Sequence, residues 1–301
     1  MSDFHGWPTK MPVGRIAYVN GRYLPLAYAG VHVEDRALQF ADGIYEVVGV
    51  LDGRILDEEH HLDRLARSVG EIQMAMPMER EALKLVIREV ARRNRIRDGL
   101  IYMQVTRGAY RRDHAIPANA ARPTLIMTAR PIDPRANDRR REQGVAAVTR
   151  PDQRWARCDI KSTALLPNIL AKTDARGAGA FEAWLIDRDG FVTEGSSTTA
   201  WIVDKVGNIV TRDLSNAILP GVTRREIIDA AAEAQIAIVE RKFTLAEALE
   251  AKEAFISAAT LGATPVISID GRKIGDGKPG PIARRLQELY RKRAEKLAET
   301  G

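Results

Sequence analysis

The sequence predicts a mixed α and β (α+β) protein of two domains, and three observations support that class. The chain has 301 residues, which at about 150 residues per domain indicates two domains. Hydrophobic residues make up 45% and charged residues 29%, the balance of a folded globular chain and not of a disordered or fibrous one. Short strand-like segments alternate with amphipathic helical segments in both halves of the chain.

The first half of the chain combines hairpins with two helices. The dipeptides Asn20-Gly21 and Asp52-Gly53 favour two-residue turns and predict a hairpin around each. Apolar residues then recur at spacings of three and four, which is typical of amphipathic helices. Together these elements make residues 1–130 one α+β domain. The expected helices cover residues 58–72 and 79–94, and further strands cover residues 100–106 and 124–128.

Residues 131–142 are predicted to link the two domains. They contain two prolines and four arginines and little apolar sequence, so they offer no face to bury. Residues 143–301 then form the second, larger domain, in which strands and helices mix. Its expected strands lie near residues 144–148, 181–186, 191–192, 199–203 and 208–211, and its helices at residues 165–176, 223–234 and 281–298.

Charge and composition favour a cytoplasmic enzyme or binding protein. The net charge is +6, but basic residues are interleaved with acidic ones, so a solvated surface is expected and no nucleic-acid partner. The chain has no run of about 18 apolar residues and no secretory signal at its start, so no membrane association is expected. The single cysteine, Cys158, cannot form an intrachain disulfide.

Two charged residues in the second domain stand within strand-like apolar sequence. A buried charge is costly unless it is paired, so Lys161 and Glu194 need a partner or a ligand. Lys161 follows Ile160, and a lysine at the edge of an apolar wall becomes nucleophilic and condenses with carbonyl groups. A solvated lysine is the alternative. For Glu194, the alternatives are a tight turn between strands and a carboxylate aimed at a cationic nitrogen.

A candidate anion site precedes the helix predicted over residues 223–234. Gly221-Val222-Thr223 offers free backbone N–H groups and a hydroxyl at the helix start, the combination that binds phosphate. A plain helix cap explains the same residues. Arg64, within the first predicted helix, is a second candidate for an anion, with an ordinary surface arginine as its alternative.

The joint order and spacing of these motifs resembles the fold-type IV pyridoxal-phosphate enzymes, the class of branched-chain and D-amino acid aminotransferases. The similarity spans about residues 15–290. It implies a two-domain fold-type IV architecture, closest to D-amino acid aminotransferase, in which residues 143–301 form the large C-terminal cofactor-binding domain. The matching segments are Glu34 to Arg36, Phe40 to Glu46, His61 to Leu65, Gln104 to Gly108, Asp159 to Ser162, Val192 to Ser197, Leu219 to Arg224 and Thr264 to Ile267.

The resemblance also implies a role for each matching cofactor residue. Lys161 holds pyridoxal 5'-phosphate as a Schiff base and then acts as general acid and base. Glu194 pairs with the pyridine nitrogen, and Arg154 buttresses that glutamate. The other implied cofactor contacts are Arg64, Val222, Thr223 and Thr260 at the phosphate, Leu219 against the ring, and Ser197.

Substrate recognition is implied by a different segment. Arg112-x-His114 resembles the carboxylate trap of D-amino acid aminotransferases, and a guanidinium fork with an imidazole suits a carboxylate. A solvated basic loop is the alternative. Leu38 stands where D-specific enzymes usually present a tyrosine hydroxyl, which predicts weaker carboxylate binding or an altered substrate range. The other residues expected in the substrate pocket are Tyr45, Tyr102 and Thr198.

The resemblance thus implies an aminotransferase that uses pyridoxal phosphate and moves amino groups between D-amino acids, such as D-alanine, and 2-oxo acids, such as 2-oxoglutarate or pyruvate. A homodimer is expected, because Arg112 and His114 should reach the neighbouring subunit's site. No metal is expected. The alternatives are a branched-chain, other L-amino acid or amine aminotransferase, an aminodeoxychorismate lyase of the same fold, and a basic binding module without catalysis.

Overall fold

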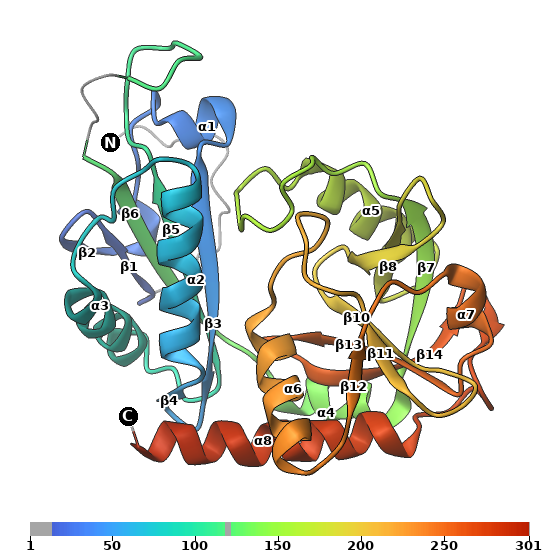
Figure 1. Cartoon of the computed structure of the whole chain (residues 1–301). Coiled ribbons are helices and arrows are strands. Elements are labelled where there is room, and N and C mark those ends of the chain that lie inside the picture. Colours follow the sequence, from blue (N-terminus) through green and yellow to red (C-terminus); the bar gives the residue numbers. More distant parts are fainter. Residues whose placement is uncertain (1–13, 118–121, 301) are drawn as a thin grey trace. The chain divides into compact units, whose positions relative to one another are not determined.

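The computed structural model describes residues 14–117 and 122–300 (Figure 1). The described residues divide into two compact units. Those of unit 1 lie within residues 1–58 and 62–132, and those of unit 2 within residues 59–61 and 133–301. Both units contain sheets and helices, so the predicted mixed α and β class is confirmed.

Unit 1 is built on a six-stranded sheet in which every neighbouring pair is antiparallel. The two predicted hairpins are confirmed, and their turns use the left-handed backbone region at Asn20, Gly21, Asp52 and Gly53. The strands are β1 (Ile16–Val19), β2 (Arg22–Pro25), β3 (Gly43–Leu51), β4 (Arg54–Ile55), β5 (Gly99–Thr106) and β6 (Thr124–Pro131), arranged in the order β2-β1-β6-β5-β3-β4.

Two of the helices of unit 1 were predicted from apolar spacing, and both are confirmed: α2 (Glu58–Glu71) and α3 (Arg80–Arg93). The apolar side chains that gave the periodicity are buried in the core, except Ile72, which is half-buried. Unit 1 also contains the short α1 (Arg36–Phe40) and the 3₁₀ turn η1 (Leu26–Tyr28), neither of which was predicted from the sequence. The side chain of Asp35 caps α1 by accepting a hydrogen bond from the N–H of Ala37 at 3.0 Å.

Unit 2 is built on a nine-stranded mixed sheet. Its strands are β7 (Val145–Pro151), β8 (Glu182–Ile186), β9 (Val192–Gly195), β10 (Thr199–Val203), β11 (Ile209–Thr211), β12 (Ile238–Glu240), β13 (Glu253–Ala258), β14 (Gly262–Ile269) and β15 (Arg272–Lys273). They follow the order β12-β11-β10-β13-β14-β7-β8-β9, with β15 beside β14. The β11–β12, β14–β7 and β7–β8 pairs are parallel and the others antiparallel.

The helices of unit 2 lie against this sheet and against each other. The predicted helices are confirmed as α5 (Leu166–Gly177), which packs on β7 and β8, α6 (Val222–Glu233), and α8 (Pro281–Thr300), which packs on α6, β13 and β14. A short α7 (Leu245–Leu249) was not anticipated.

The segment expected to link the domains contains a helix, α4 (Pro134–Gln143), which is grouped with unit 2. Asp133 caps it by accepting a hydrogen bond from the N–H of Arg135 at 3.0 Å, and proline is compatible with its first turn. The cap and the proline favour a helix start here, but α4 has no apolar stripe. The spacing of apolar residues therefore did not predict this helix. Across the described residues, no helix is both long enough and apolar enough to span a membrane.

Candidate active site

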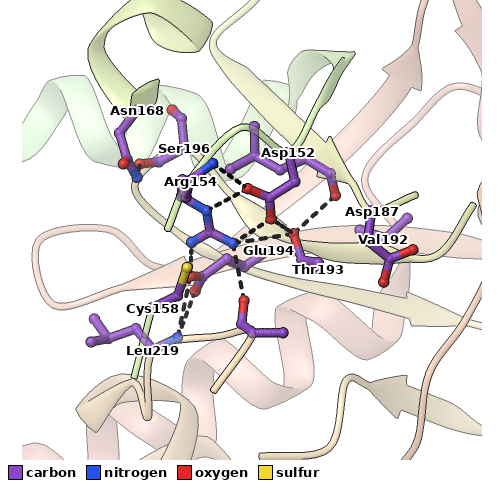
Figure 2. Close-up of polar contacts among 12 residues, drawn as sticks. Asp152, Arg154, Cys158, Asn168, Asp187, Val192, Thr193, Glu194, Ser196 and Leu219 are labelled. Atoms are coloured by element: carbon purple, nitrogen blue, oxygen red, sulfur yellow. Dashed lines mark hydrogen bonds and ion pairs between the residues drawn. The ribbon is translucent and has the colours of Figure 1, made fainter. Parts of the chain in front are cut away.

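Glu194, in β9, is paired with Arg154 in a nearly enclosed position (Figure 2). Nη1 of Arg154 donates to Oε1 of Glu194, and the N–H of Leu219 donates to both carboxylate oxygens, at 3.2 and 3.3 Å. Burial raises the pKa of Glu194, although Arg154, the Leu219 amide and Lys161 act to lower it. The structure therefore brings together Arg154, Glu194 and Leu219, with Lys161 near enough to act on the carboxylate electrostatically.

Asp152 holds the guanidinium of Arg154 from its other side (Figure 2). Nε and Nη2 of Arg154 donate to the two oxygens of Asp152 at 2.9 and 2.7 Å, and Nη2 also donates to the carbonyl of Ala217 at 3.0 Å. Oγ1 of Thr193 donates to Asp152 at 2.7 Å. Burial acts to raise the pKa of Asp152, but the hydrogen bonds from Arg154 and Thr193 prevail and lower it. These contacts aim the remaining nitrogen, Nη1, at Glu194.

Lys161 lies in the loop that leads into α5, where it is half-buried. The two residues before it, Asp159 and Ile160, are each 4% exposed, and Asp159 accepts both hydrogen bonds of a forked pair from Arg157, at 2.9 and 3.0 Å. The lysine therefore stands at the edge of a buried segment.

Cys158, three residues before this lysine, is a packed thiol. Its Sγ donates to the carbonyl of Trp155 at 3.1 Å, and burial raises the pKa of the thiol to about 11. A thiol with that pKa is protonated near neutral pH and is a poor nucleophile.

The start of α6 presents backbone and side-chain donors that have no partner within the helix. The N-cap, Gly221, carries no capping side chain, so the first N–H groups of the helix, including those of Val222 and Thr223, have no partner within the helix. Thr223 is 3% exposed, and its Oγ1 has no hydrogen-bond partner among the described residues. An unpaired buried hydroxyl beside free amides at a helix N-terminus fits a phosphate group.

Three candidate segments meet at one end of the sheet of unit 2. Thr199, the first residue of β10, pairs with Ser257 near the end of β13, and the turn from β13 to β14 carries Thr260. A Cβ added to Gly221 would approach Oγ1 of Thr199 to 3.1 Å, so the start of α6 adjoins the same end. The carbonyl of Thr260 is held by Nδ2 of Asn137, in α4, at 2.7 Å. This end of the sheet thus gathers the candidate phosphate ligands of unit 2.

Ser197 and Thr198 use their hydroxyl protons within the protein. Both donate to Oε2 of Glu182, at 2.9 and 3.0 Å, and Ser196 donates to Oε1. Glu182 has no exposed surface, and Nζ of Lys172 lies 3.1 Å from its Oε1. The structure therefore places Ser197 and Thr198 in a turn organised by a buried carboxylate. Their roles toward cofactor and substrate stay predictions.

Arg64, in unit 1, is paired with Glu46 of β3. Its Nε and Nη2 reach the two carboxylate oxygens at 2.8 Å each, and the glutamate has no exposed surface. This forked pair fixes the orientation of the guanidinium. Its predicted role at the phosphate stays a prediction, as do those of Val222, Thr223 and Thr260.

The predicted carboxylate trap and Leu38 lie in unit 1. Arg112 and His114 are exposed and lie beside the ring of Phe40, with the Arg112 guanidinium 5.1 Å and the His114 ring 5.2 Å from its centre. Leu38, in α1, is 65% exposed.

The two predicted pocket tyrosines are neighbours on the sheet of unit 1. The rings of Tyr45 in β3 and Tyr102 in β5 stack with centres 5.8 Å apart. Burial, with a smaller effect of Tyr45, raises the pKa of Tyr102 to about 12, and its hydroxyl donates to Gln104 at 2.6 Å. Tyr102 therefore stays neutral over the physiological pH range.

Sequence reasoning missed four polar residues that position the candidate site: Asp152, Glu182, Glu46 and Asn137. Glu46 and Glu182 carried a usable signal, because each is a carboxylate set in an apolar strand sequence and such a charge needs a partner. Asp152 and Asn137 carried none, since each acts through a contact that only the fold creates.

Comparison with known proteins finds consistent similarities. The family model described as amino-transferase class IV matches residues 43–269. The chain is 40% identical over 273 residues to the D-alanine aminotransferase of Listeria innocua, covering 90% of this chain and 93% of the relative. It is 39% identical over 268 residues to the D-alanine aminotransferase of Bacillus licheniformis, covering 89% and 93%.

Solved structures agree in fold. The branched-chain amino acid aminotransferase of Escherichia coli superposes with a TM-score of 0.84 at 25% identity, covering 91% of this chain and 93% of that one. The T.th. branched-chain amino acid aminotransferase with pyridoxamine 5'-phosphate gives a TM-score of 0.84 at 28% identity, covering 92% and 93%.

Proposed function

The chain belongs to the class IV aminotransferases, which are pyridoxal-phosphate enzymes of fold type IV, and from that premise we propose that it transfers amino groups between D-amino acids and 2-oxo acids. The observation that carries the proposal is the enclosed pair of Arg154 and Glu194 with Lys161 beside it, in the unit that also bears the candidate anion site at the start of α6. D-Alanine is the amino donor named for the relatives from Listeria innocua and Bacillus licheniformis, and this supports a D-amino acid as substrate.

The residues of unit 2 fit the cofactor chemically. The unpaired buried hydroxyl of Thr223 and the free amides at the start of α6 suit a phosphate, and the carboxylate of Glu194 suits a protonated ring nitrogen. Pyridoxal phosphate, when bound, supplies a ring that accepts electrons from the substrate α-carbon. Val222, Thr223 and Thr260 would hold the phosphate together with Arg64, and Leu219 and Ser197 complete the proposed set of cofactor contacts.

Lys161 is the residue that would hold the cofactor covalently and move a proton at the substrate α-carbon. It is half-buried and directly follows the buried Ile160, so its amine lies at the edge of the buried segment that precedes α5.

Glu194 would keep a proton on the ring nitrogen through its negative charge. The hydrogen bonds from Arg154 and from the N–H of Leu219 stabilise that charge against the cost of burial. A charge-assisted hydrogen bond of this kind is worth about 1.5–3 kcal/mol, or roughly one to two powers of ten in rate if it acts mainly in the transition state.

Arg112 and His114 would bind the substrate carboxylate. Among the described residues, no acidic side chain forms an ion pair with Arg112, so its guanidinium is available to a ligand. Tyr45, Tyr102 and Thr198 are proposed as further substrate contacts, and Leu38 as the position that alters the substrate range. We propose that the trap serves a second copy of the chain in a homodimer. Sedimentation of the purified protein tests this, since a fully active monomer contradicts it.

We also propose a cytoplasmic location, which the single cysteine supports because no intrachain disulfide is possible. Cell fractionation with an antibody to the protein tests it, and recovery outside the cytoplasmic fraction contradicts it.

The amino acid enantiomer is tested directly by turnover. Purified protein is mixed with 2-oxoglutarate and either D-alanine or L-leucine, and both amino products are followed. The proposal predicts glutamate and pyruvate from D-alanine. Turnover confined to L-leucine would transfer the assignment to a branched-chain activity, which the TM-score of 0.84 to the Escherichia coli enzyme makes the second candidate.

A further inference from the structure

Arg36, at the start of α1, ties down the loop that carries Arg112 and His114. Its Nη1 donates to the carbonyl of Asp113 at 2.5 Å, and its Nη2 to the carbonyl of His114 at 3.4 Å. Arg36 is 4% exposed, whereas residues 111–116 are all exposed. A buried guanidinium fork therefore holds the backbone of an exposed loop at the two residues that follow Arg112.

The fork is itself fixed by an ion pair. Nε of Arg36 donates to Oδ2 of Asp42 at 2.7 Å, and Arg107 donates to both oxygens of the same carboxylate at 2.7 and 3.0 Å. Burial acts to raise the pKa of Asp42, but the hydrogen bonds from Arg107 and Arg36 outweigh it and lower the pKa. The carboxylate is thus charged near neutral pH and keeps Arg36 in place.

Phe40 links the same arginine to the side chains of the loop. The guanidinium of Arg36 lies 4.8 Å from the centre of its ring, that of Arg112 lies 5.1 Å from it, and the His114 ring lies 5.2 Å from it. Cations within about 6 Å of an aromatic centre are attracted to the ring. One ring therefore contacts the anchor and both members of the proposed carboxylate trap.

We infer that Arg36 is a positioning residue that sets the affinity for the substrate carboxylate by fixing the loop of Arg112 and His114. The inference rests on the proposed function, in which Arg112 and His114 bind that carboxylate. The guanidinium N–H groups of Arg36 donate to Asp113, His114 and Asp42. Arg36 therefore acts on substrate binding through the loop. Ordering a loop when the substrate binds costs conformational entropy and lowers affinity. A loop that is already ordered avoids this cost.

The test compares two lysine substitutions in the same ion-pair cluster. Arg36→Lys keeps a positive charge for Asp42 but loses the fork to the two loop carbonyls. Arg107→Lys is the matched control, because Arg107 shares Asp42 and is also 4% exposed, yet its other donors go to the carbonyls of Ile72 and Gln73.

On purified holoenzyme, Arg36→Lys should raise KM for D-alanine and the dissociation constant of the unreactive carboxylate D-lactate by about tenfold or more, the loss of one charge-assisted hydrogen bond. The kcat at saturating D-alanine should stay within about twofold, because the reacting atoms are untouched. Arg107→Lys should lower the melting temperature without changing either constant. Equal constants in Arg36→Lys and wild type overturn the inference, as does a loss of kcat with KM unchanged.

A second variant covers the case in which Arg36→Lys does not fold. Phe40→Leu removes the ring beside Arg112 and His114 while leaving the ion pair of Arg36 with Asp42, and it must raise the same two constants. An unchanged KM in Phe40→Leu then overturns the inference. Failure of the proposed function is distinct, since in that case the wild-type holoenzyme itself turns over no D-amino acid.

Discussion

Arg154 donates from Nη1 to Oε1 of Glu194, and the two side chains are only 6% and 9% exposed. Asp152 occupies the other edge of the same guanidinium, so one arginine is paired with two enclosed carboxylates. Removing one partner of a buried pair leaves the other charge unpaired, which typically costs about 3–5 kcal/mol.

Replacing this arginine should therefore damage both stability and turnover. We expect Arg154→Met to lower the free energy of unfolding by about 3–5 kcal/mol. It should also lower kcat by about tenfold or more, because a Glu194 without its partner takes up a proton and no longer pairs with the ring nitrogen. Urea denaturation and steady-state kinetics on D-alanine measure the two effects.

Arg157→Met is the matched control for this substitution. Arg157 lies in the same segment, but its forked pair is with Asp159 and leaves the carboxylate of Glu194 to Arg154. It should lose stability and keep kcat. If Arg154→Met and Arg157→Met reduce kcat equally, the special role of Arg154 is refuted.

Thr223 offers a test in which stability and cofactor affinity move independently. Its Oγ1 is buried and has no partner among the described residues, so Thr223→Val removes a group that costs about 1–3 kcal/mol when left unpaired. The apoprotein should be as stable as wild type or more so, whereas the affinity for pyridoxal phosphate should fall about tenfold. Calorimetry of the apoprotein and absorbance titration with the cofactor measure the two.

Thr211→Val provides the contrast. Thr211 has no exposed surface, and its hydroxyl donates to the carbonyl of Ala200 at 3.0 Å. This variant should destabilise the apoprotein by about 1 kcal/mol and leave cofactor affinity unchanged. A destabilised Thr223→Val that binds pyridoxal phosphate like wild type would show that its hydroxyl serves the fold and not the phosphate.

Asp152 should contribute to the acid sensitivity of unit 2. Its pKa is lowered in the folded protein, since the hydrogen bonds from Arg154 and Thr193 outweigh its burial. A lowered folded pKa gives stability that is present above the unfolded pKa of about 3.9 and is lost as the pH falls through the folded value.

The measurement is the free energy of unfolding between about pH 5 and pH 3. Asp152→Asn should be less stable at pH 7 by about 1.5–3 kcal/mol and should depend less steeply on pH than wild type. Asp174→Asn, at a carboxylate 59% exposed, should keep the wild-type slope. Parallel pH curves for wild type and Asp152→Asn would contradict the account of this group.

Much of the fold could be predicted, because turns and amphipathic helices depend on residues that are close together in the sequence. The turns at Asn20-Gly21 and Asp52-Gly53 and the helices α2, α3, α5, α6 and α8 follow from dipeptides and spacing. The hairpin of β13 and β14 was not predicted, because a continuous apolar run does not by itself distinguish a buried strand from a buried helix. In the fold, Gly262 takes a positive φ at the start of β14, where the turn needs it.

Candidate site residues that belong to sequence motifs could be predicted. Those that reach the site only through packing of the folded chain could not. Lys161, Glu194 and Thr223 stand in recognisable sequence patterns, and the structure places Lys161 and Glu194 near each other. Asp152 accepts hydrogen bonds from the backbone N–H and from Nε of Arg154. These contacts require a backbone turn over residues 152–154 that forms only in the folded chain. Arg36 reaches the loop of His114 across 78 positions of sequence, a distance that no local pattern spans.

The covalent bond at Lys161 is the claim on which the cofactor assignment rests. Purified coloured protein is reduced with borohydride, digested and analysed by peptide mass spectrometry. We expect a pyridoxyl phosphate mass on the peptide that contains Lys161 and on no other lysine peptide. Reduced protein whose Lys161 peptide carries no added mass would contradict it.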